Sequence, residues 1–496
     1  MSIFGDSIQR YYRTMRIGTL RMLTQPAIAL LMAALAPQAL ADCDPQELAK
    51  LLADDVTLYN KFGHSVAVSG ETMLIGAYDN DLYGGEYAGS VFVLVGEGET
   101  WTQKAKLTAP NPTALDLFGY SVAISGNTAV IGAPLDGNAG GVHAGAVYIF
   151  VRSGDAWIQQ AKLTAADPAT EDDFGCSVAI AGDTVVVGAC YDDHAGGIDA
   201  GSVYIFVRSG EVWTQQAKLT AADPASIDYF GYAVTISGET VVIGAHYDSY
   251  NGKTSAGSAY VFVRSGALWS QQAKLTPDDA ANYDYFGHSV AISGDTALIG
   301  SEGDDHAGGD EAGSAYVFVR SGTLWSQQAK LTADDAAEED YFGSSVAITG
   351  DTALIGSPVD DYAGGGDAAG SAYVFVRSGA LWSQQAKLTA NDAARGDYFG
   401  SCAAISGDTA LIGAPLNDEG EEINAGSAYV FDLNCTFCLG DLDGDNDVDL
   451  ADLATLLAHY GTTSGATYAD GDLDEDGDVD LSDLALLLSL YGQPCP

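Results

Sequence analysis

Short apolar runs separated by glycine-rich polar segments recur along most of the chain. In the stretch Phe286–Gly300, two β-branched runs flank Ser293–Thr296, whose central residues are glycine and then aspartate. Glycine in the first place of a two-residue loop predicts a type II′ β-hairpin. A polar loop over 304–313 follows, and third and fourth strands are expected over 314–320 and 324–331. The pattern therefore predicts a unit of four short antiparallel strands.

This unit occurs seven times at an almost constant period. Each copy begins with a Phe-Gly pair, and these pairs start at Phe62, Phe118, Phe174, Phe230, Phe286, Phe342 and Phe399. A constant period of this size indicates one supersecondary unit that is used repeatedly. Four strands in each of seven units are typical of the blades of a β-propeller, and a solenoid of stacked hairpins is the alternative.

The two ends of the repeat region favour a closed ring. The seventh repeat ends at Phe431 after its third strand, so its fourth strand is missing. Residues 47–55 match the fourth-strand segment 327–335 of another repeat. An N-terminal strand that completed the last blade would remove the open ends of a solenoid. The predicted fold is mainly β, a seven-bladed propeller over 42–434 closed by this strand, followed by a small α module over 435–496.

The motifs at the repeat ends resemble a known family. The Phe-Gly starts, and the Gly-Ala-Pro sequences at Gly132–Pro134 and Gly413–Pro415, are similar to the FG-GAP repeats of integrin α subunits and of many bacterial surface proteins. The resemblance covers about residues 44–434 and implies a seven-bladed propeller that acts in extracellular binding or adhesion. Four repeats depart from proline at the last position, with Tyr78, Cys190, His246 and Glu302.

Members of that family often carry calcium loops inside blades. Here the corresponding loops, Asp192–Asp199 and Asp360–Asp367, lack the alternate-residue spacing of an oxygen cage. We expect them to be solvated acidic loops, and weak calcium sites are the alternative.

The C-terminal module contains two matched acidic loops that begin at Asp441 and Asp472. Carboxylates stand at positions 1, 3, 5, 7, 9 and 12 of each, namely Asp441, Asp443, Asp445, Asp447, Asp449 and Asp452, then Asp472, Asp474, Asp476, Asp478, Asp480 and Asp483. This spacing, with position 7 offering its carbonyl oxygen, suits Ca²⁺ and predicts two EF-hand-like sites. A helix is expected after each loop, because leucines and a tyrosine recur on one apolar face in Leu450–Tyr460 and Leu481–Tyr491.

The doubled loop and helix, with aspartate at position 12 and no entering helix, resemble a type I dockerin. The resemblance implies two Ca²⁺ ions and a cohesin-type protein partner through which the chain is tethered. In that family positions 10 and 11 are usually small and polar and contact the cohesin, whereas here they are Leu450-Ala451 and Leu481-Ser482. Packing on a neighbour, or service as a calcium-dependent stalk, is the alternative role.

The N-terminus predicts export. Residues 1–41 match a signal peptide, with a basic segment that contains Arg10 and Arg21, the apolar segment Ala27–Ala36 and the small-residue cleavage motif Ala39–Ala41. The apolar segment is too short to span a bilayer, and no later segment is long and apolar enough. We therefore expect a secreted protein, in solution or at the cell surface. Its net charge of −48 argues against nucleic acid as a partner.

Seven cysteines in a secreted chain predict disulfides with one thiol left over. The predicted pairs are Cys43–Cys435 and Cys438–Cys495, with Cys43–Cys438 and Cys435–Cys495 as the alternative. A Cys176–Cys190 bond is less favoured, because the two-residue hairpin loop would direct these side chains to opposite faces unless a β-bulge changed the register. Cys402 remains as the odd thiol, in the first strand of the seventh blade.

Near-identical repeats argue against an enzyme, because a catalytic site needs residues that differ between copies. The six tryptophans share one repeat position and are expected to pack between blades, with a sugar-binding face as the alternative. The candidate polar residues that break the repeat, His64, His143, His246 and Glu302, belong to different blades. The sequence favours a non-catalytic propeller that binds an extracellular protein or glycan. The alternatives are a polysaccharide-active glycosidase or lyase and a purely structural surface-layer protein.

Overall fold

The computed structural model describes residues 45–54, 59–80, 87–98, 100–361, 366–418, 423–433, 442, 448, 450–463, 471–473 and 477–491. The predicted signal peptide and the cysteines Cys43, Cys435, Cys438 and Cys495 lie outside these residues. The chain divides into two compact units, Asp44–Cys435 and a second unit that contains Thr436–Pro496.

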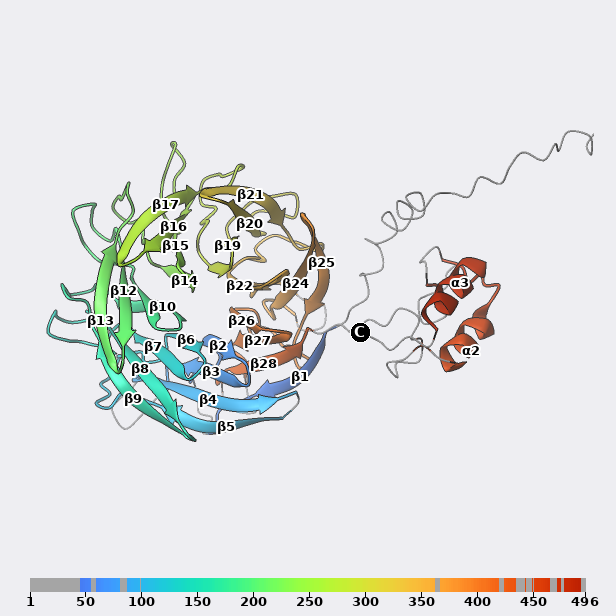
Figure 1. Cartoon of the computed structure of the whole chain (residues 1–496), viewed down its shortest axis with the longest axis horizontal. Coiled ribbons are helices and arrows are strands. Elements are labelled where there is room, and N and C mark those ends of the chain that lie inside the picture. The colour runs from blue at the N-terminus through green and yellow to red at the C-terminus, as the bar shows by residue number, and fades with distance from the viewer. Residues whose placement is uncertain are drawn as a thin grey trace, which may run out of the picture. The chain divides into compact units, whose positions relative to one another are not determined.

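The larger unit is a seven-bladed β-propeller built from seven four-stranded antiparallel sheets (Figure 1). Blade 1 consists of β2 (Ser65–Ser69), β3 (Thr72–Ala77), β4 (Ser90–Glu97) and β5 (Thr100–Leu107). Blade 2 consists of β6 (Ser121–Ser125), β7 (Thr128–Ala133), β8 (Ala146–Ser153) and β9 (Ala156–Leu163). Blade 3 consists of β10 (Phe174–Ala181), β11 (Thr184–Ala189), β12 (Ser202–Ser209) and β13 (Val212–Leu219).

The next three blades repeat this order. Blade 4 consists of β14 (Ala233–Ser237), β15 (Thr240–Ala245), β16 (Ser258–Ser265) and β17 (Leu268–Leu275). Blade 5 consists of β18 (Val290–Ser293), β19 (Thr296–Ser301), β20 (Ser314–Ser321) and β21 (Leu324–Leu331). Blade 6 consists of β22 (Ser345–Thr349), β23 (Thr352–Ser357), β24 (Ser371–Ser378) and β25 (Leu381–Leu388).

Blade 7 joins the two ends of the repeat region. It consists of β26 (Cys402–Ser406), β27 (Thr409–Ala414), β28 (Ser427–Asp432) and the N-terminal strand β1 (Gln46–Leu51), which pairs antiparallel with β28. Glu47 lies opposite Phe431, as Gln327 lies opposite Phe318 in blade 5. The predicted closure by an N-terminal strand is therefore confirmed. The first strand of each blade lies nearest the centre of the ring and the fourth lies at the rim (Figure 1).

The glycines of the Phe-Gly and Gly-Ala motifs lie where the backbones of neighbouring blades come into contact. Gly119 of blade 2 has a φ of +92°, which favours glycine. A Cβ on Gly76 of blade 1 would lie 2.2 Å from the Gly119 carbonyl oxygen. Phe118, beside this contact, is fully buried, and burial of a phenylalanine side chain contributes about 1.5–3 kcal/mol. Each motif thus fixes one blade against the next.

A side-chain hydrogen bond runs along most of these contacts. A serine of one blade donates to the Phe-Gly carbonyl of the next at Ser65, Ser121, Ser177, Ser289 and Ser345. Where blade 7 meets blade 1, Cys402 takes the serine's place, and its Sγ lies 2.9 Å from the Gly63 oxygen. Burial raises the pKa of the Cys402 thiol to about 12, so it stays protonated as a donor. Cys402 lies in β26, the first strand of the seventh blade, where the sequence places it.

The tryptophans pack between blades, as predicted. Each contacts a hydrophobic cluster drawn from two blades. The Arg208 guanidinium lies over the Trp213 ring, 5.2 Å from its centroid, and covers the ring's outer face.

The acidic loops are solvated only in part: Asp193, Asp361 and Asp367 are exposed as expected, whereas the first aspartate of each loop is not. Asp192 and Asp360 are buried, with 2 % and 5 % of their surface exposed, and each is paired with a lysine of the outermost strand. Lys218 Nζ lies 3.0 Å from Asp192 Oδ2 and 2.9 Å from Asp167 Oδ2. The first aspartates depart from the expectation because a carboxylate can be buried when a counter-charge pairs with it, and the lysine that supplies this charge is distant in sequence. Among the residues described in these loops, no three ligand side chains lie close enough together for one ion.

The smaller unit contains two matched helices, α2 (Leu450–His459) and α3 (Leu481–Leu490). Leu456 and Leu487 are fully buried at equivalent positions and pack with Val448, Leu473 and Val479. Gly461 follows α2 with a φ of +92°, as expected at a helix end. Neither helix is long and apolar enough to cross a membrane, a finding that covers the described residues.

Candidate functional site

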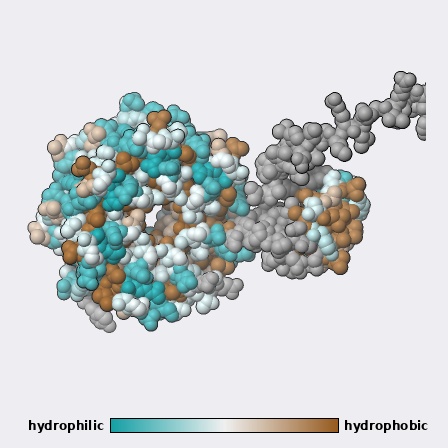
Figure 2. Space-filling model, viewed as in Figure 1, coloured by the Kyte–Doolittle hydropathy of each residue, from teal (hydrophilic) through white to brown (hydrophobic). Residues whose placement is uncertain are grey.

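Two positions of the repeat bring differing side chains together around the propeller axis. One directly follows Phe-Gly and holds His64, Tyr120, Cys176, Tyr232, His288, Ser344 and Ser401. The other follows the second strand and holds Tyr78, Pro134, Cys190, His246, Glu302, Pro358 and Pro415. Both lie at the same end of the inner strands, so seven blades place them in one ring, which we call the axial ring. The surface is hollowed at the centre of the propeller (Figure 2).

One sector of the axial ring is aromatic. The His64 ring lies 4.3 Å from the Tyr78 ring and 5.1 Å from the Tyr120 ring, measured between centroids. Burial, aided by the charge of Lys61, lowers the pKa of His64 to about 4. His64 is therefore neutral at physiological pH. Burial also raises the pKa of Tyr120 above its ordinary value, so the Lys61 ammonium, which donates to the Tyr78 hydroxyl at 2.8 Å, is the charge beside these rings.

The opposite sector is a polar network across blades 4, 5 and 6. His288 Nε2 lies 3.3 Å from Glu302 Oε1 and 3.4 Å from the Tyr232 hydroxyl. Ser344 donates its hydroxyl to Glu302 Oε2 at 2.6 Å. The His246 ring packs 4.0 Å from Tyr232, and its buried Nδ1 has no hydrogen-bond partner among the described residues. Burial, together with the nearby His288, lowers the pKa of His246 well below its ordinary value.

A cavity of about 410 Å³ opens within the axial ring. Its lining includes His64, Tyr120, Tyr232 and Ser401, so blades 1, 2, 4 and 7 all reach it. Asp173 adds a carboxyl group, and its pKa rises to about 7 because of burial and the nearby charges of three acids, Glu171, Asp172 and Asp199. The wall of this cavity is about as polar as it is apolar, and its volume lies in the range of small-ligand sites.

The thiols of Cys176 and Cys190 form part of the cavity wall. In this hairpin Ser177 pairs with Gly188, the register that a two-residue loop requires. The register then shifts at a β-bulge between Phe174 and Ser177. This bulge brings Cys176 Sγ to 3.3 Å from the Cys190 backbone nitrogen. The two residues are therefore neighbours despite the register argument, and both are free thiols here.

A row of tyrosines continues outward from the axial ring. Ring centroids are 5.0 Å apart for Tyr191 and Tyr229, 5.1 Å for Tyr229 and Tyr247, and 5.2 Å for Tyr247 and Tyr285. Tyr191 and Tyr247 are more than a third exposed. Tyr229 and Tyr285 adopt φ values of 53° and 55°, and the residue before Phe-Gly has a similar φ in every blade, so this conformation belongs to the repeat. These rings offer an amphipathic surface beside the cavity.

Three of the four candidate residues from the sequence meet in this ring. His64, His246 and Glu302 belong to different blades, and in a propeller that is how residues converge on the axis. His143 does not join them: it lies in the loop before β8, where its carbonyl accepts the Asp173 N–H. Sequence reasoning missed His288 and Asp173. Alignment of the repeat positions would have found both, because Asp173 stands where the other blades carry a lysine, a leucine or a tyrosine.

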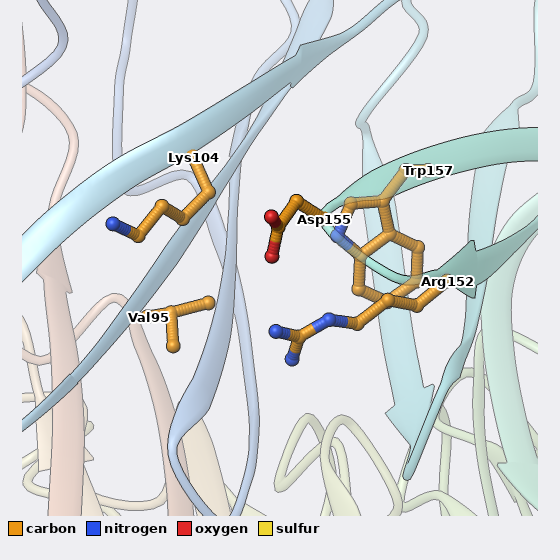
Figure 3. A pocket seen from close by; sticks show the side chains of 5 residues that line it. All are labelled: Val95, Lys104, Arg152, Asp155 and Trp157. Atoms are coloured by element: carbon orange, nitrogen blue, oxygen red, sulfur yellow. The ribbon is translucent and has the colours of Figure 1, made fainter.

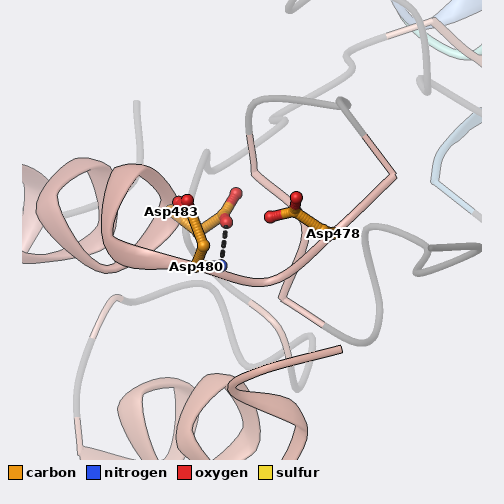
Figure 4. Close-up of side chains that lie close together, drawn as sticks. All are labelled: Asp478, Asp480 and Asp483. Carbon is orange, nitrogen blue, oxygen red and sulfur yellow. Dashed lines mark hydrogen bonds between the residues drawn. The ribbon is translucent and has the colours of Figure 1, made fainter. Parts of the chain in front are cut away.

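The second acidic loop of the C-terminal unit gathers three of its predicted ligands. Single oxygens of Asp478, Asp480 and Asp483 lie within 4.8 Å of one another (Figure 4). Asp480 caps α3 by accepting the Ser482 N–H, and Asp483 Oδ2 accepts the Asp480 N–H at 2.7 Å. Gly477 at position 6 has a φ of +86°, the sharp turn that the loop requires. Asp474 and Asp476 lie outside the described residues.

The first loop shows the same arrangement at its end. Asp452 Oδ1 accepts the Leu442 N–H at 2.6 Å, as Asp483 Oδ1 accepts the Leu473 N–H at 2.7 Å. Asp441, Asp443, Asp445, Asp447 and Asp449 lie outside the described residues.

Comparison with known proteins identifies the larger unit. A model of the FG-GAP repeat matches seven segments, 45–94, 101–150, 157–206, 213–262, 269–318, 325–375 and 382–431. The chain belongs to the FG-GAP repeat family. No curated protein matches this FG-GAP protein. Among solved structures it is similar to the crystal structure of Saccharomyces cerevisiae Sqt1, with 11% identity and a TM-score of 0.42, over 78% of this chain and 99% of that one.

Proposed function

We propose that this FG-GAP protein is a secreted or cell-surface binding propeller that holds its ligand at the axial ring. The observation that carries the proposal is the convergence of residues that differ between blades on one cavity, within an otherwise repetitive scaffold. Differences of this kind do not help the repeats to pack, whereas a binding site requires different side chains around its ligand. The predicted signal peptide and the strongly acidic surface support an extracellular setting.

The protonation states of four residues of the axial ring suit an uncharged ligand. His64 and His246 are neutral at physiological pH, and the raised pKa values of Tyr120 and Tyr232 keep their hydroxyls protonated. These groups donate and accept hydrogen bonds without a formal charge. Together with the exposed tyrosines they suit a hydroxyl-rich ligand such as a glycan or a polar protein loop.

An extracellular polysaccharide-active enzyme is the second candidate. The Glu302–His288–Tyr232 network favours it, because a carboxylate that orients an imidazole is a recurring feature of general acid–base sites. Release of reducing ends from a polysaccharide panel, and its loss in Glu302→Gln, would support the enzyme. Binding without turnover would support the first proposal.

The C-terminal unit is proposed to bind two Ca²⁺ ions. Its second loop fits the ion, because buried Asp472 Oδ1 has no hydrogen-bond partner among the described residues and the side chains of Asp478, Asp480 and Asp483 converge nearby in the loop. Oxygen atoms only, several of them carboxylate, are the donor set that Ca²⁺ prefers. Asp472, Asp474, Asp476, Asp480 and Asp483 would hold the second ion with the Asp478 carbonyl, and Asp441, Asp443, Asp445, Asp449 and Asp452 would hold the first with the Asp447 carbonyl.

The dockerin-like role is proposed as a calcium-dependent tether to a cohesin-type protein partner. Leu450 and Leu481, at position 10 of each loop, are each 67% exposed, and Leu457 and Leu488 are also exposed. Only part of the predicted apolar face of each helix is therefore buried in the core of this unit. Hydrophobic residues gather on the visible face of this unit (Figure 2), and an exposed apolar surface of this kind suits a partner protein.

A glycan and protein array tests the proposal. The full chain should bind a defined subset of ligands, and Tyr232→Ala should remove the ligands of this subset that lack acidic sugars while Ile158→Ala, at an exposed residue on outer strand β9, should not. Chelator should remove binding to a cohesin panel and leave axial binding unchanged. Retention of every array signal in Tyr232→Ala would contradict the axial site.

A further inference from the structure

Four of the propeller's seven interfaces share a clasp at the outer strands. The interface of blades 1 and 2 lacks it, as do the two interfaces of blade 7, where Trp101 donates instead to the Gly98 carbonyl of its own blade and β1 contains no tryptophan. In the shared form, the tryptophan indole N–H donates to a glutamine of the preceding blade. The donor–acceptor pairs are Trp213–Gln160, Trp269–Gln216, Trp325–Gln272 and Trp382–Gln328, at 2.8–3.0 Å. Between blades 1 and 2, Lys104 stands in place of the glutamine and cannot accept. Trp157 is left with no hydrogen-bond partner among the described residues.

The arginine of the clasp is also altered at this interface. Arg208, Arg264, Arg320 and Arg377 each pair with an acid in the first turn of their own blade and donate to a threonine of the preceding blade. In blade 2 that acid is replaced by Asn127. The Arg152 side chain makes one described hydrogen bond, from Nε to the Gly154 carbonyl, and no described carboxylate lies within ion-pair distance. Two substitutions at this interface, lysine for glutamine and asparagine for an acid, thus leave the Trp157 N–H and the Arg152 guanidinium without the partners that their counterparts have.

These donors face a groove of about 270 Å³ lined by Val95, Lys104, Arg152, Asp155 and Trp157. Figure 3 shows the Arg152 guanidinium and the Asp155 carboxylate extending from beside the indole ring toward Val95, whereas the Lys104 side chain lines the other side of the groove and its ammonium points away from them. Lys104 and Asp155 are exposed and make no ion pair within the described part of the chain. The groove carries two cations and one anion on a chain whose net charge is −48.

We propose that this groove binds a hexuronic acid unit of an acidic polysaccharide. The guanidinium of Arg152 has the planar fork that pairs with a carboxylate, and the Lys104 ammonium adds a second charge-assisted donor. Asp155 accepts hydrogen bonds from ring hydroxyls, and the Trp157 N–H donates to a hydroxyl oxygen. The indole face and Val95 cover the apolar face of the sugar. A simple anion would leave Asp155 and the indole unused, and a neutral sugar would leave both cations unused.

The acidic surface does not prevent this binding. At physiological ionic strength the Debye length is about 8 Å, so exposed carboxylates beyond that distance act weakly on a ligand in the groove. The two cations lie inside that distance. Affinity for the acid should therefore fall as salt screens Lys104 and Arg152, whereas affinity for a neutral sugar should not change.

Isothermal titration calorimetry of the full chain with a galacturonic acid trisaccharide, and with the neutral galactose trisaccharide, tests the proposal. The wild type should bind the acid in a one-to-one complex and at least about tenfold more tightly than the neutral sugar, because charge-assisted hydrogen bonds are lost with the latter. The double variant Lys104→Gln/Asn127→Asp restores the clasp of the other interfaces. It should lose at least about tenfold in affinity for the acid while its Tm stays equal or rises.

The chain also offers a matched gain of function. Gln160→Lys with Asp183→Asn copies the departures to the interface of blades 2 and 3, where Glu211 stands in place of Asp155. This variant should bind two trisaccharides instead of one. Unchanged affinity in the restored variant, equal affinity for the acidic and neutral sugars, or inorganic sulfate binding as tightly as the trisaccharide would overturn the proposal. If the array shows no binding at the axial ring, these outcomes are unaffected, because the groove and the axial ring share no residue.

Discussion

Asp173 should make the propeller less stable at neutral pH than at pH 4. It is the acidic residue at a position where the other six blades carry Lys61, Leu117 or a tyrosine, and it lines the axial cavity. Burial and the charges of Glu171, Asp172 and Asp199 raise its pKa from 3.8 to about 7. The folded chain therefore binds a proton at Asp173 at pH values where the unfolded chain has released it.

The sign and size of the effect follow from this difference. Between about pH 4 and pH 7 the folded state binds more protons at Asp173, so the contribution of this group to the free energy of unfolding falls as pH rises through this window and is then level. Each pKa unit corresponds to about 1.4 kcal/mol, which gives at most about 4 kcal/mol above pH 7. Partial exposure of Asp173 reduces this, so Asp173→Asn should stabilise the chain by about 2–4 kcal/mol at pH 8 and by about zero at pH 4.

Urea unfolding of the wild type and of Asp173→Asn at pH 4, 6 and 8 measures the effect. Asp167→Asn is the control with the opposite sign, because Lys218 outweighs burial and lowers the pKa of Asp167. That substitution should destabilise the chain at pH 8. A change in stability on Asp173→Asn that is independent of pH, or a destabilisation at pH 8, would refute the reasoning.

Three further predictions concern the rest of the chain. Lys218→Met should cost about 3–5 kcal/mol in urea unfolding, because it leaves buried Asp192 without its counter-charge, whereas Lys104→Met should cost less than about 0.5 kcal/mol. A chelator should abolish the helical circular dichroism of the C-terminal unit, and Asp441→Ala or Asp472→Ala should each remove about one Ca²⁺ in equilibrium dialysis; a helical signal unchanged in excess chelator would contradict the calcium loops. Peptide mapping without reduction should find Cys43 joined to Cys435 and Cys438 to Cys495, and a Cys435–Cys438 bond would contradict both pairs.

The architecture could be predicted from the sequence because it rests on local patterns. The two-residue turn at Gly182 sets the pairing of Ser177 with Gly188, and it is visible as a glycine followed by an aspartate. The N-terminal strand was recognisable because residues 47–55 copy an internal repeat. The bulge beside Cys176 has no such signature, so the nearness of Cys176 and Cys190 was not expected.

The candidate site depended on distances that no local pattern contains. Asp192 and Lys218 are 26 residues apart, and only the blade geometry shows that the first aspartate of the acidic loop is buried and paired. His64 and Glu302 were recognised as exceptions to the repeat, but their convergence requires the ring to close. The exposed leucines of α2 and α3 matched an apolar helical face in the sequence, and periodicity alone does not show how much of such a face a small core covers.

The most direct test of the central claim is to fill the axial cavity and measure binding. Ser401→Phe places a ring in the cavity from blade 7, and Tyr120→Phe removes one hydroxyl from its wall with little change in packing. Affinity for the array ligands is measured by calorimetry for both variants, with Tm and circular dichroism as checks of folding. The account predicts loss of binding in Ser401→Phe and weaker binding in Tyr120→Phe. Wild-type affinity in both folded variants would contradict an axial binding site.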